Sequence, residues 1–143
     1  MDDASPSDSL YRAVEAVLAA WVVRSVMRHA PHLTHEARLA GIEAEATVLP
    51  VLRRLLDIDV AEQRTNPLAI LRSTVKYPTG VLRAGGVAPV HRDSFALQNF
   101  PDDVYNLAPS TWRDLDDALF EPGMMWGAWK AAVILGRRRA VEN

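Results

Sequence analysis

Cysteine is absent from this chain of 143 residues, and lysine occurs only twice, at Lys76 and Lys130. Without a thiol the protein can form no disulfide bond, use no thiolate nucleophile and hold no zinc ion through sulfur. The charges nearly balance, since 16 basic and 18 acidic residues give a net charge of −2. A protein of this charge has no general attraction to nucleic acid, so we expect no nucleic-acid partner.

A long hydrophobic run is also missing. A helix needs about 20 consecutive apolar residues to span a bilayer, and no stretch of this chain reaches that length. Residues 1–9 are acidic and polar, whereas a signal peptide starts with a basic region followed by an apolar one. We therefore expect a cytoplasmic protein with no membrane span.

Motifs of several common enzyme classes are missing as well. No Glu is followed three residues later by His, as in di-iron helical bundles. His35-Glu36 lacks the second His of a zinc-protease helix, and Gly80–Val87 lacks the Lys and Ser or Thr of a phosphate-binding loop. There is no Gly-x-Ser-x-Gly sequence either. These absences favour a protein that is not an enzyme, and we assign no catalytic residue, no metal ligand and no cofactor.

The most distinctive stretch that is present runs from Gly123 to Gly136. Between Met124 and Leu135 its only charged residue is Lys130. A helix that is apolar on every side is normally buried on every side. Since this segment is too short for a bilayer, the pattern predicts the central helix of a small helical domain.

Helical periodicity also marks the first third of the chain. A helix is predicted from Ser9 up to Pro31, with an apolar stripe made of Leu10, Val14, Val17, Leu18, Trp21 and Val22. A second helix starts with Thr34 as its N-cap. Its inner face is expected to comprise Leu39, Ile42, Ala46 and Leu49. Pro50 should kink or break this helix at Val48–Leu49, or begin a separate short helix.

Asn66-Pro67 is typical of a third helix start, with a capping side chain followed by proline at the first helical position. Pro78 is expected to stop or bend this helix near Tyr77. Thr79–Gly86 should then form one more helical turn closed by the two glycines, and a hairpin over Val81–Val90 is the alternative.

From Val87 to Pro109 the periodicity disappears. Because this segment contains Phe and Tyr, which favour burial, we expect an ordered wrap over the bundle with a helical turn at Asp102–Leu107. Ser110 or Thr111 should cap a helix running from Trp112 to Phe120. Glu121-Pro122-Gly123 is expected to form a tight corner before the C-terminal helix.

These patterns predict an all-α fold: a single-domain helical bundle of five or six helices with a long irregular segment wrapped over it. The domain should span residues 9–139. A disordered N-terminal tail at 1–8 and a C-terminal tail at 140–143 should flank it.

A histidine cluster, His29, His32 and His35, could supply imidazoles to a divalent metal ion. Pro31 prevents one helix from presenting all three, and no cysteine or close pair of carboxylates completes a site. We therefore interpret the cluster as a polar connection between two helices and expect no bound metal.

Ligand binding is assigned instead to His91, Arg92, Asp93 and Tyr105. Ionisable groups on an ordered irregular segment over a helical scaffold are where ligand sites concentrate. The alternative is structural: Arg92 and the nearby aspartates cap short turns and pair with one another, because a polar loop must satisfy its own backbone.

Two functional hypotheses follow. The first is a non-catalytic regulatory or scaffolding protein that binds a protein partner or associates with itself as a homodimer. The second is a small-molecule-binding protein or enzyme with a polar site around His91, Arg92 and Asp93, beside an apolar pocket from the C-terminal helix. A flat exposed apolar patch would favour the first hypothesis, and a pocket with convergent polar groups would favour the second.

Overall fold

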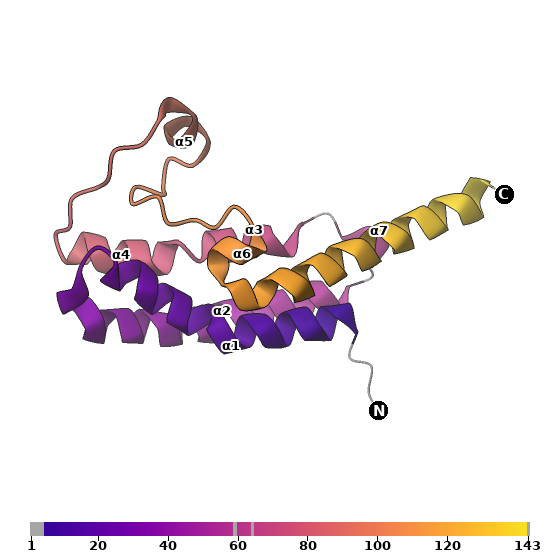
Figure 1. Ribbon diagram of the computed structural model, residues 1–143, viewed down its shortest axis with the longest axis horizontal. Helices are drawn as coiled ribbons and strands as arrows, with labels where there is room; N and C mark the ends of the chain where they lie inside the picture. The colour runs from indigo at the N-terminus through magenta and orange to yellow at the C-terminus, as the bar shows by residue number, and fades with distance from the viewer. Residues whose placement is uncertain (1–4, 59, 64, 143) are drawn as a thin grey trace.

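The computed structural model describes residues 5–58, 60–63 and 65–142, and these residues form helices and loops without a strand (Figure 1). The predicted all-α class is confirmed. In chain order the α-helices are α1 Pro6–Met27, α2 Thr34–Asp57, α3 Pro67–Ser73, α4 Lys76–Ala84, α5 Ser94–Asn99, α6 Trp112–Leu115 and α7 Phe120–Glu142. Short 3-10 turns lie between them: η1 Pro31–Leu33, η2 Val60–Glu62 and η3 Asp117–Leu119.

Helix α1 forms as its apolar stripe predicts. It begins at Pro6 rather than Ser9, because the side chain of Ser5 accepts a hydrogen bond from Asp8 N at 3.1 Å and proline suits the first helical position. Residues 1–4 of the predicted tail lie outside the described residues. Pro6, Ser7 and Asp8, which were also expected in the tail, belong to α1. The stripe is buried as expected, with only Val17 partly exposed.

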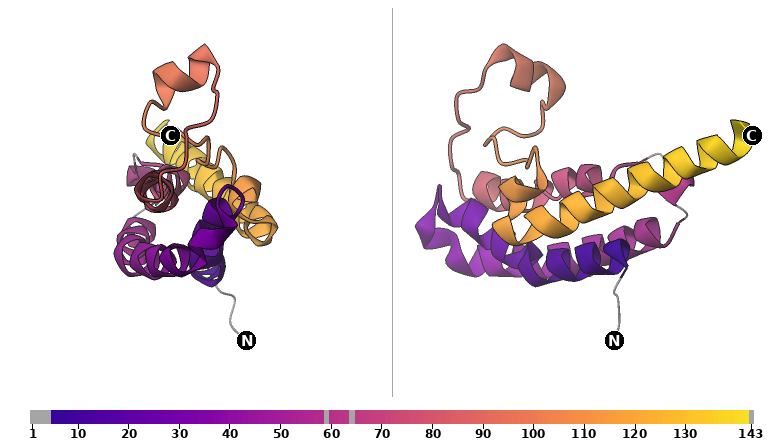
Figure 2. Two further views of the ribbon diagram at one scale, coloured as in Figure 1. Left: turned by 90° about the vertical axis from the view of Figure 1, so that its left-hand side faces the viewer. Right: turned by 45° about the vertical axis from the view of Figure 1, so that its right-hand side comes forward.

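Helices α1 and α2 lie side by side and antiparallel along the lower side of the molecule in Figures 1 and 2, and the other helices pack above them. The predicted inner face of α2 is confirmed at Leu49, which is buried, but wrong at the other three positions: Leu39 is 55% exposed, Ile42 is 64% exposed, and Ala46 is exposed too. Small residues are buried in the first half of α2 instead, namely Ala37, Ala40, Gly41 and Ala44, followed by larger ones from Val48 onward. A Cβ atom added at Gly41 would lie 3.1 Å from Ala19 O, so the two backbones approach closely.

Pro50 neither breaks α2 nor begins a new helix, because the helix is continuous from Thr34 to Asp57. Pro50 and Ala46 are both exposed, so water can reach the carbonyl that loses its intrahelical partner. Thr34 is the first helical residue rather than the N-cap. Its hydroxyl donates a hydrogen bond to Pro31 O at 2.9 Å.

Helix α3 confirms the prediction for Asn66-Pro67, whereas α4 contradicts the prediction for Pro78. Asn66 caps α3 as predicted, since its side chain accepts a hydrogen bond from Leu68 N at 3.0 Å. Pro78 does not stop a helix but lies in the first turn of α4, where a missing N–H has no intrahelical partner to lose. The helical turn predicted before the glycines is confirmed, and Gly86 ends it with a φ of 74°.

The segment Val87–Pro109 stands out from the helical body and carries α5 at its tip (Figures 1 and 2). The helical turn expected at Asp102–Leu107 does not form, since these residues adopt non-helical turns. Below it, Thr111 caps α6 and forms a reciprocal capping box with Asp114. The helix predicted from Trp112 to Phe120 is interrupted at Asp116, whose side chain caps η3.

The prediction that the C-terminal apolar segment is the central helix is wrong. Helix α7 packs by one side against α1, η2 and η3, and its C-terminal part projects past the other helices (Figures 1 and 2). Trp126 is buried on the inner side, whereas Met124, Met125 and Leu135 are exposed on the outer side. The expected corner at residues 121–123 is the first turn of this helix, which continues to Glu142.

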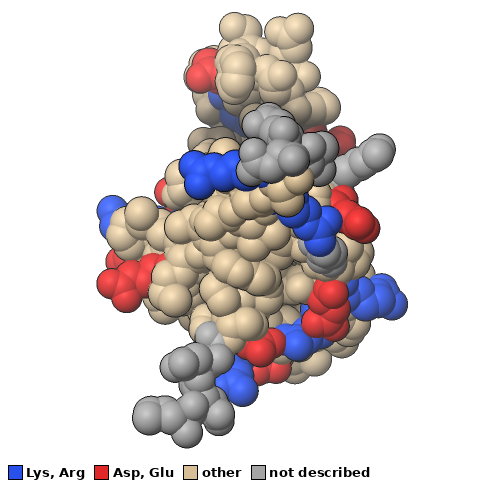
Figure 3. All heavy atoms as spheres, turned by 90° about the vertical axis from the view of Figure 1, so that its right-hand side faces the viewer, with Lys and Arg blue, Asp and Glu red and all other residues tan. Residues whose placement is uncertain are grey.

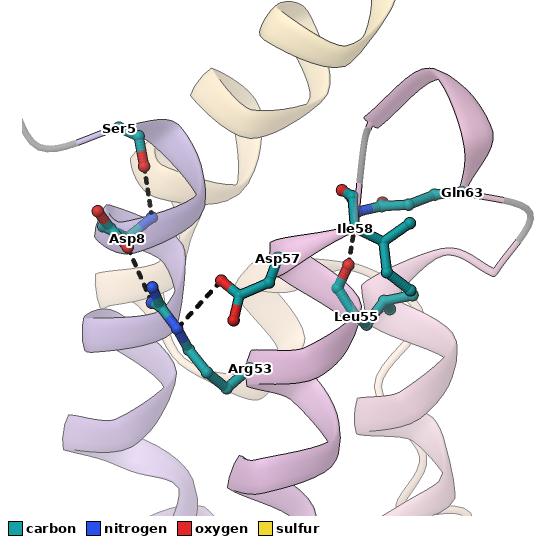
Figure 4. A network of polar contacts seen from close by, with 7 residues as sticks. All are labelled: Ser5, Asp8, Arg53, Leu55, Asp57, Ile58 and Gln63. Carbon is teal, nitrogen blue, oxygen red and sulfur yellow. Dashed lines mark hydrogen bonds and ion pairs between the residues drawn. The ribbon is translucent and has the colours of Figure 1, made fainter.

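A polar network joins the N-terminal end of α1 to the C-terminal end of α2 (Figure 4). Arg53 donates a hydrogen bond to Asp8 at 2.8 Å and lies 3.3 Å from an Asp57 oxygen. The hydrogen bond from Arg53 is the main reason why the pKa of Asp8 lies below its ordinary value. Gln63 closes the end of α2 by donating to Leu55 O at 2.7 Å.

Candidate functional site

The irregular segment is fixed to the bundle by Tyr105. Its ring is buried in a cluster with Val26 of α1, Ala37 of α2, Leu82 of α4, and Ala30 between α1 and η1. Its hydroxyl donates a hydrogen bond to Val87 O at 2.6 Å. Next to it, Val90 N donates to Val104 O at 3.1 Å, so the two ends of the segment lie together. Tyr105 is therefore a structural anchor, and it faces the core rather than a ligand cavity.

Arg92 is buried in the same segment, with only 7% of the residue exposed. Its Nη2 atom donates hydrogen bonds to Ala96 O at 2.8 Å and Phe100 O at 2.5 Å, at the C-terminal end of α5. The Nε and Nη1 atoms are buried and have no hydrogen-bond partner among the described residues. No carboxylate of these residues forms an ion pair with this guanidinium.

The neighbouring aspartates are occupied by backbone N–H groups. Asp103, which is also buried, accepts hydrogen bonds from Leu107 N at 2.7 Å and Ala108 N at 2.9 Å. Asp93 caps α5 by accepting from Ala96 N at 2.8 Å. Both carboxylates thus stabilise local turns, as the structural alternative to a ligand site predicts.

A cavity of about 190 Å³ lies between this segment and the end of α3. Arg72 of α3 closes one side, because its Nε donates to Pro109 O and its Nη2 donates to Ser110 O, both at 3.0 Å. The polar side chains that line the cavity are Arg72, Arg92, Asp93, Asp103, Asn106 and Ser110. The cavity therefore gathers two guanidinium groups and two carboxylates in a small volume, and the Arg92 nitrogens without a partner are the donors that it offers to a compact oxyanion.

The four predicted ligand residues do not form one group. Arg92 and Asp93 line the cavity, whereas His91 is exposed outside it and Tyr105 is held in the core. Arg72 was missed because it belongs to α3, about 20 residues earlier in the chain, and no local pattern connects it to the irregular segment.

A larger hollow is an open groove of about 760 Å³ between α2 and α4. Its charged side chains are Glu36, Glu43 and Lys76, which are exposed. None of the buried polar atoms that lack a partner belongs to a residue lining this groove. The groove therefore offers less chemistry than the smaller cavity at Arg92.

The second candidate is the outer side of α7. Met125 is 52% exposed and Leu135 is 51% exposed, and the alanines between them are exposed too. Lys130 lies on the other side of the helix, with its ammonium 5.0 Å from the centre of the Trp126 ring. Figure 3 looks at the end of the molecule past which α7 projects, and it shows a broad uncharged area there with charged groups around its edges.

A metal site and a membrane span are two further kinds of functional feature. Within the described residues no three His, Cys, Asp or Glu side chains come together to hold a metal ion, and His32 and His35 are exposed. No helix in the described part of the chain is long and apolar enough to cross a membrane.

Comparisons of the chain with models of protein families, with curated proteins and with solved structures gave no match.

Proposed function

We propose that the protein is a non-catalytic regulatory or scaffolding protein that acts through protein–protein contacts, with the outer side of α7 as its contact surface. The observation that carries this proposal is the uncovered apolar side of α7, whose residues between Met124 and Leu135 include a single charge, Lys130. Only one side of α7 packs against the rest of the chain, while Met124, Met125 and Leu135 face outward.

A partner that covers the outer side of α7 gains free energy by burying its apolar side chains. Burying a large aliphatic side chain contributes about 1.5–3 kcal/mol relative to leaving it in water. Met124, Met125 and Leu135 are about half exposed, so a partner that covers them gains about half of such a contribution at each, without having to desolvate a charge. Methionine is also enriched where proteins bind one another.

Site-specific photo-cross-linking tests this proposal in cells that produce the protein. A photoreactive residue at position 125 should give a cross-linked product of discrete mass, and one at position 42 of α2 is the matched control. Ile42 is also an exposed apolar residue, but it belongs to a different face. The proposal fails if position 125 yields no product with any protein, or the same products as position 42.

A second candidate function is the binding of a small oxyanion in the cavity at Arg92. The specific observation in its favour is a buried guanidinium with two nitrogen atoms that lack partners. A buried cation is costly unless it is paired, so an anion in the cavity would stabilise the folded protein.

Thermal unfolding with inorganic phosphate tests this second function. Phosphate at about 100 times its Kd should stabilise the wild type by about 2.7 kcal/mol. Arg92→Gln should abolish the rise in Tm, while Arg54→Gln, which changes an exposed arginine of α2, should preserve it. Equal shifts in all three proteins would mean that phosphate acts non-specifically, and binding at Arg92 would be excluded.

A further inference from the structure

The outer side of α7 carries one straight apolar stripe. Met125, Ala128, Ala132 and Leu135 are separated by steps of three, four and three residues. Alternating steps of three and four keep side chains on one line of an α-helix, as in the contact line of a coiled coil. All four residues are exposed, so nothing in the described chain covers this stripe.

A charged residue lies at each end of the stripe, and the two charges have opposite signs. Glu121 lies four residues before Met125, and Arg139 lies four residues after Leu135, so both continue the same spacing. Both are exposed. The distance between them along the helix is about 27 Å, at a rise of about 1.5 Å per residue. The stripe is therefore acidic at its start, apolar in its middle and basic at its end.

From this pattern we infer that the partner of α7 is a second copy of the chain, packed antiparallel against the same stripe. This inference rests on the proposed function, because it names the occupant of the same surface. The positions are arranged symmetrically about residue 130. An antiparallel pair with its two-fold axis there places Glu121 opposite Arg139, Met125 opposite Leu135, and Ala128 opposite Ala132 of the partner.

The chemistry of each pair favours this register. Ala128 and Ala132 are small enough to let the two helix backbones approach closely at the centre. Met125 and Leu135 fill the space on either side, and the ion pairs lie at the solvent-exposed rim. A parallel pair would instead place Glu121 beside Glu121 and Arg139 beside Arg139, where like charges repel. The arrangement is isologous, as in most dimers.

The fold leaves room for this pairing. The stripe lies on the side of α7 opposite to Trp126, which packs against the core. The bodies of the two subunits would therefore lie on opposite sides of the helix pair. Because one helix pair buries less than the roughly 800 Å² per partner of a standard interface, we expect a Kd in the micromolar range.

Engineered disulfides test the register. Because the chain has no cysteine, they can form only between the introduced cysteines. Ala128→Cys and Ala132→Cys are made in separate chains of different mass, mixed in equal amounts and oxidised. Random pairing would make the product joining position 128 to position 132 equal to the sum of the two products that join identical positions. The antiparallel register predicts that it clearly exceeds this sum. Identical positions are offset by four residues, about 6 Å along the axis, which is unfavourable for disulfide geometry.

Ala20→Cys on α1 is the control, since Ala20 is an exposed helical alanine on another face. Mixed with Ala128→Cys, it should give only the background of random collisions. An excess of products joining identical positions would establish a parallel pair and overturn the inference. Statistical amounts of the three products, or yields no higher than the control, would overturn it too.

Charge reversal gives an independent readout by sedimentation equilibrium of the purified full-length chain. Glu121→Arg should weaken the dimer about tenfold, since two ion pairs become two repulsive contacts. The double variant Glu121→Arg with Arg139→Glu should restore the Kd to within about threefold, because each new charge again meets its opposite. Failure of the double variant to restore binding would refute the pairing of these two residues.

The outcome also separates this inference from the proposed function. If the purified protein stays monomeric at concentrations about 100 times above the micromolar range, self-pairing is excluded. A cross-link from position 125 to a different protein would then uphold the contact surface while identifying another occupant. If position 125 gives no cross-link in cells, both proposals fail.

Discussion

Replacing Gly41 with alanine tests how closely α1 and α2 approach. In a helix interior alanine is more favourable than glycine by about 1 kcal/mol, so the substitution should stabilise the protein if space were available. A Cβ atom at Gly41 would lie 3.1 Å from Ala19 O, 3.2 Å from Ala19 Cβ and 3.3 Å from Ala19 Cα. Carbon atoms normally separate by about 3.5–4.0 Å, so one helix must move.

Gly80 supplies the matched control, because it lies within α4 and a Cβ there would meet no atom within 4 Å. Gly80→Ala should stabilise the fold by about 0.5–1 kcal/mol. Overpacking costs about 1–3 kcal/mol, so Gly41→Ala should be about 2 kcal/mol less favourable than Gly80→Ala. The net effect at Gly41 is a destabilisation of about 1 kcal/mol.

Urea unfolding followed by tryptophan fluorescence measures the difference. With an m value of about 2 kcal/mol/M, the midpoints of the two variants should differ by about 1 M. The measurement belongs at a protein concentration below the dimer Kd, so that association does not contribute. If Gly41→Ala stabilises the protein as much as Gly80→Ala does, the close approach of α1 and α2 is refuted.

Three further predictions concern the core, the irregular segment and the end network. Leu18→Ala should destabilise the fold by about 2–5 kcal/mol in urea unfolding, because Leu18 is fully buried. Leu39→Ala should change stability by no more than about 0.5 kcal/mol, because Leu39 is exposed, and equal losses would contradict the assignment of faces in α2. Tyr105→Phe should lower stability by about 1 kcal/mol and raise hydrogen exchange near Val87, whose carbonyl loses its donor. Since the pKa of Asp8 is lowered in the folded state, its contribution to stability should be present above the ordinary aspartate pKa and disappear as the pH falls through the folded-state value. Asp8→Asn should remove this part of the acid dependence, and an unchanged profile of Tm against pH would argue against the ion pair with Arg53.

The helical class and the first helix could be predicted because large apolar residues at helical spacing specify a buried stripe wherever the helix packs. The inner face of α2 could not. There the closest contact selects small residues such as Ala37 and Gly41, while Leu39 and Ile42 remain outside. A pattern based on hydrophobicity assigns the larger residues to the core, although backbone proximity favours the smaller ones.

Helix α7 misled the prediction for a related reason. A segment that is apolar on every side must be covered on every side, but the sequence does not say whether its own chain or another chain provides the cover. At the candidate cavity, Arg92 and Asp93 could be predicted from their position on an irregular segment. Arg72 could not be predicted, because it reaches the cavity only through the way in which α3 packs against Pro109 and Ser110.

The closure of the irregular segment at its base has an evolutionary consequence. The hydrogen bonds from Tyr105 to Val87 and from Val90 to Val104 bring the two ends of the irregular segment together. Residues 91–103 therefore project from the bundle as a closed loop. A loop whose ends already meet can be lengthened, shortened or exchanged at a small entropic cost to the scaffold. Sequence change can therefore accumulate between Val90 and Val104 without unfolding the bundle, and the cavity at Arg92 can be gained, altered or lost as a module.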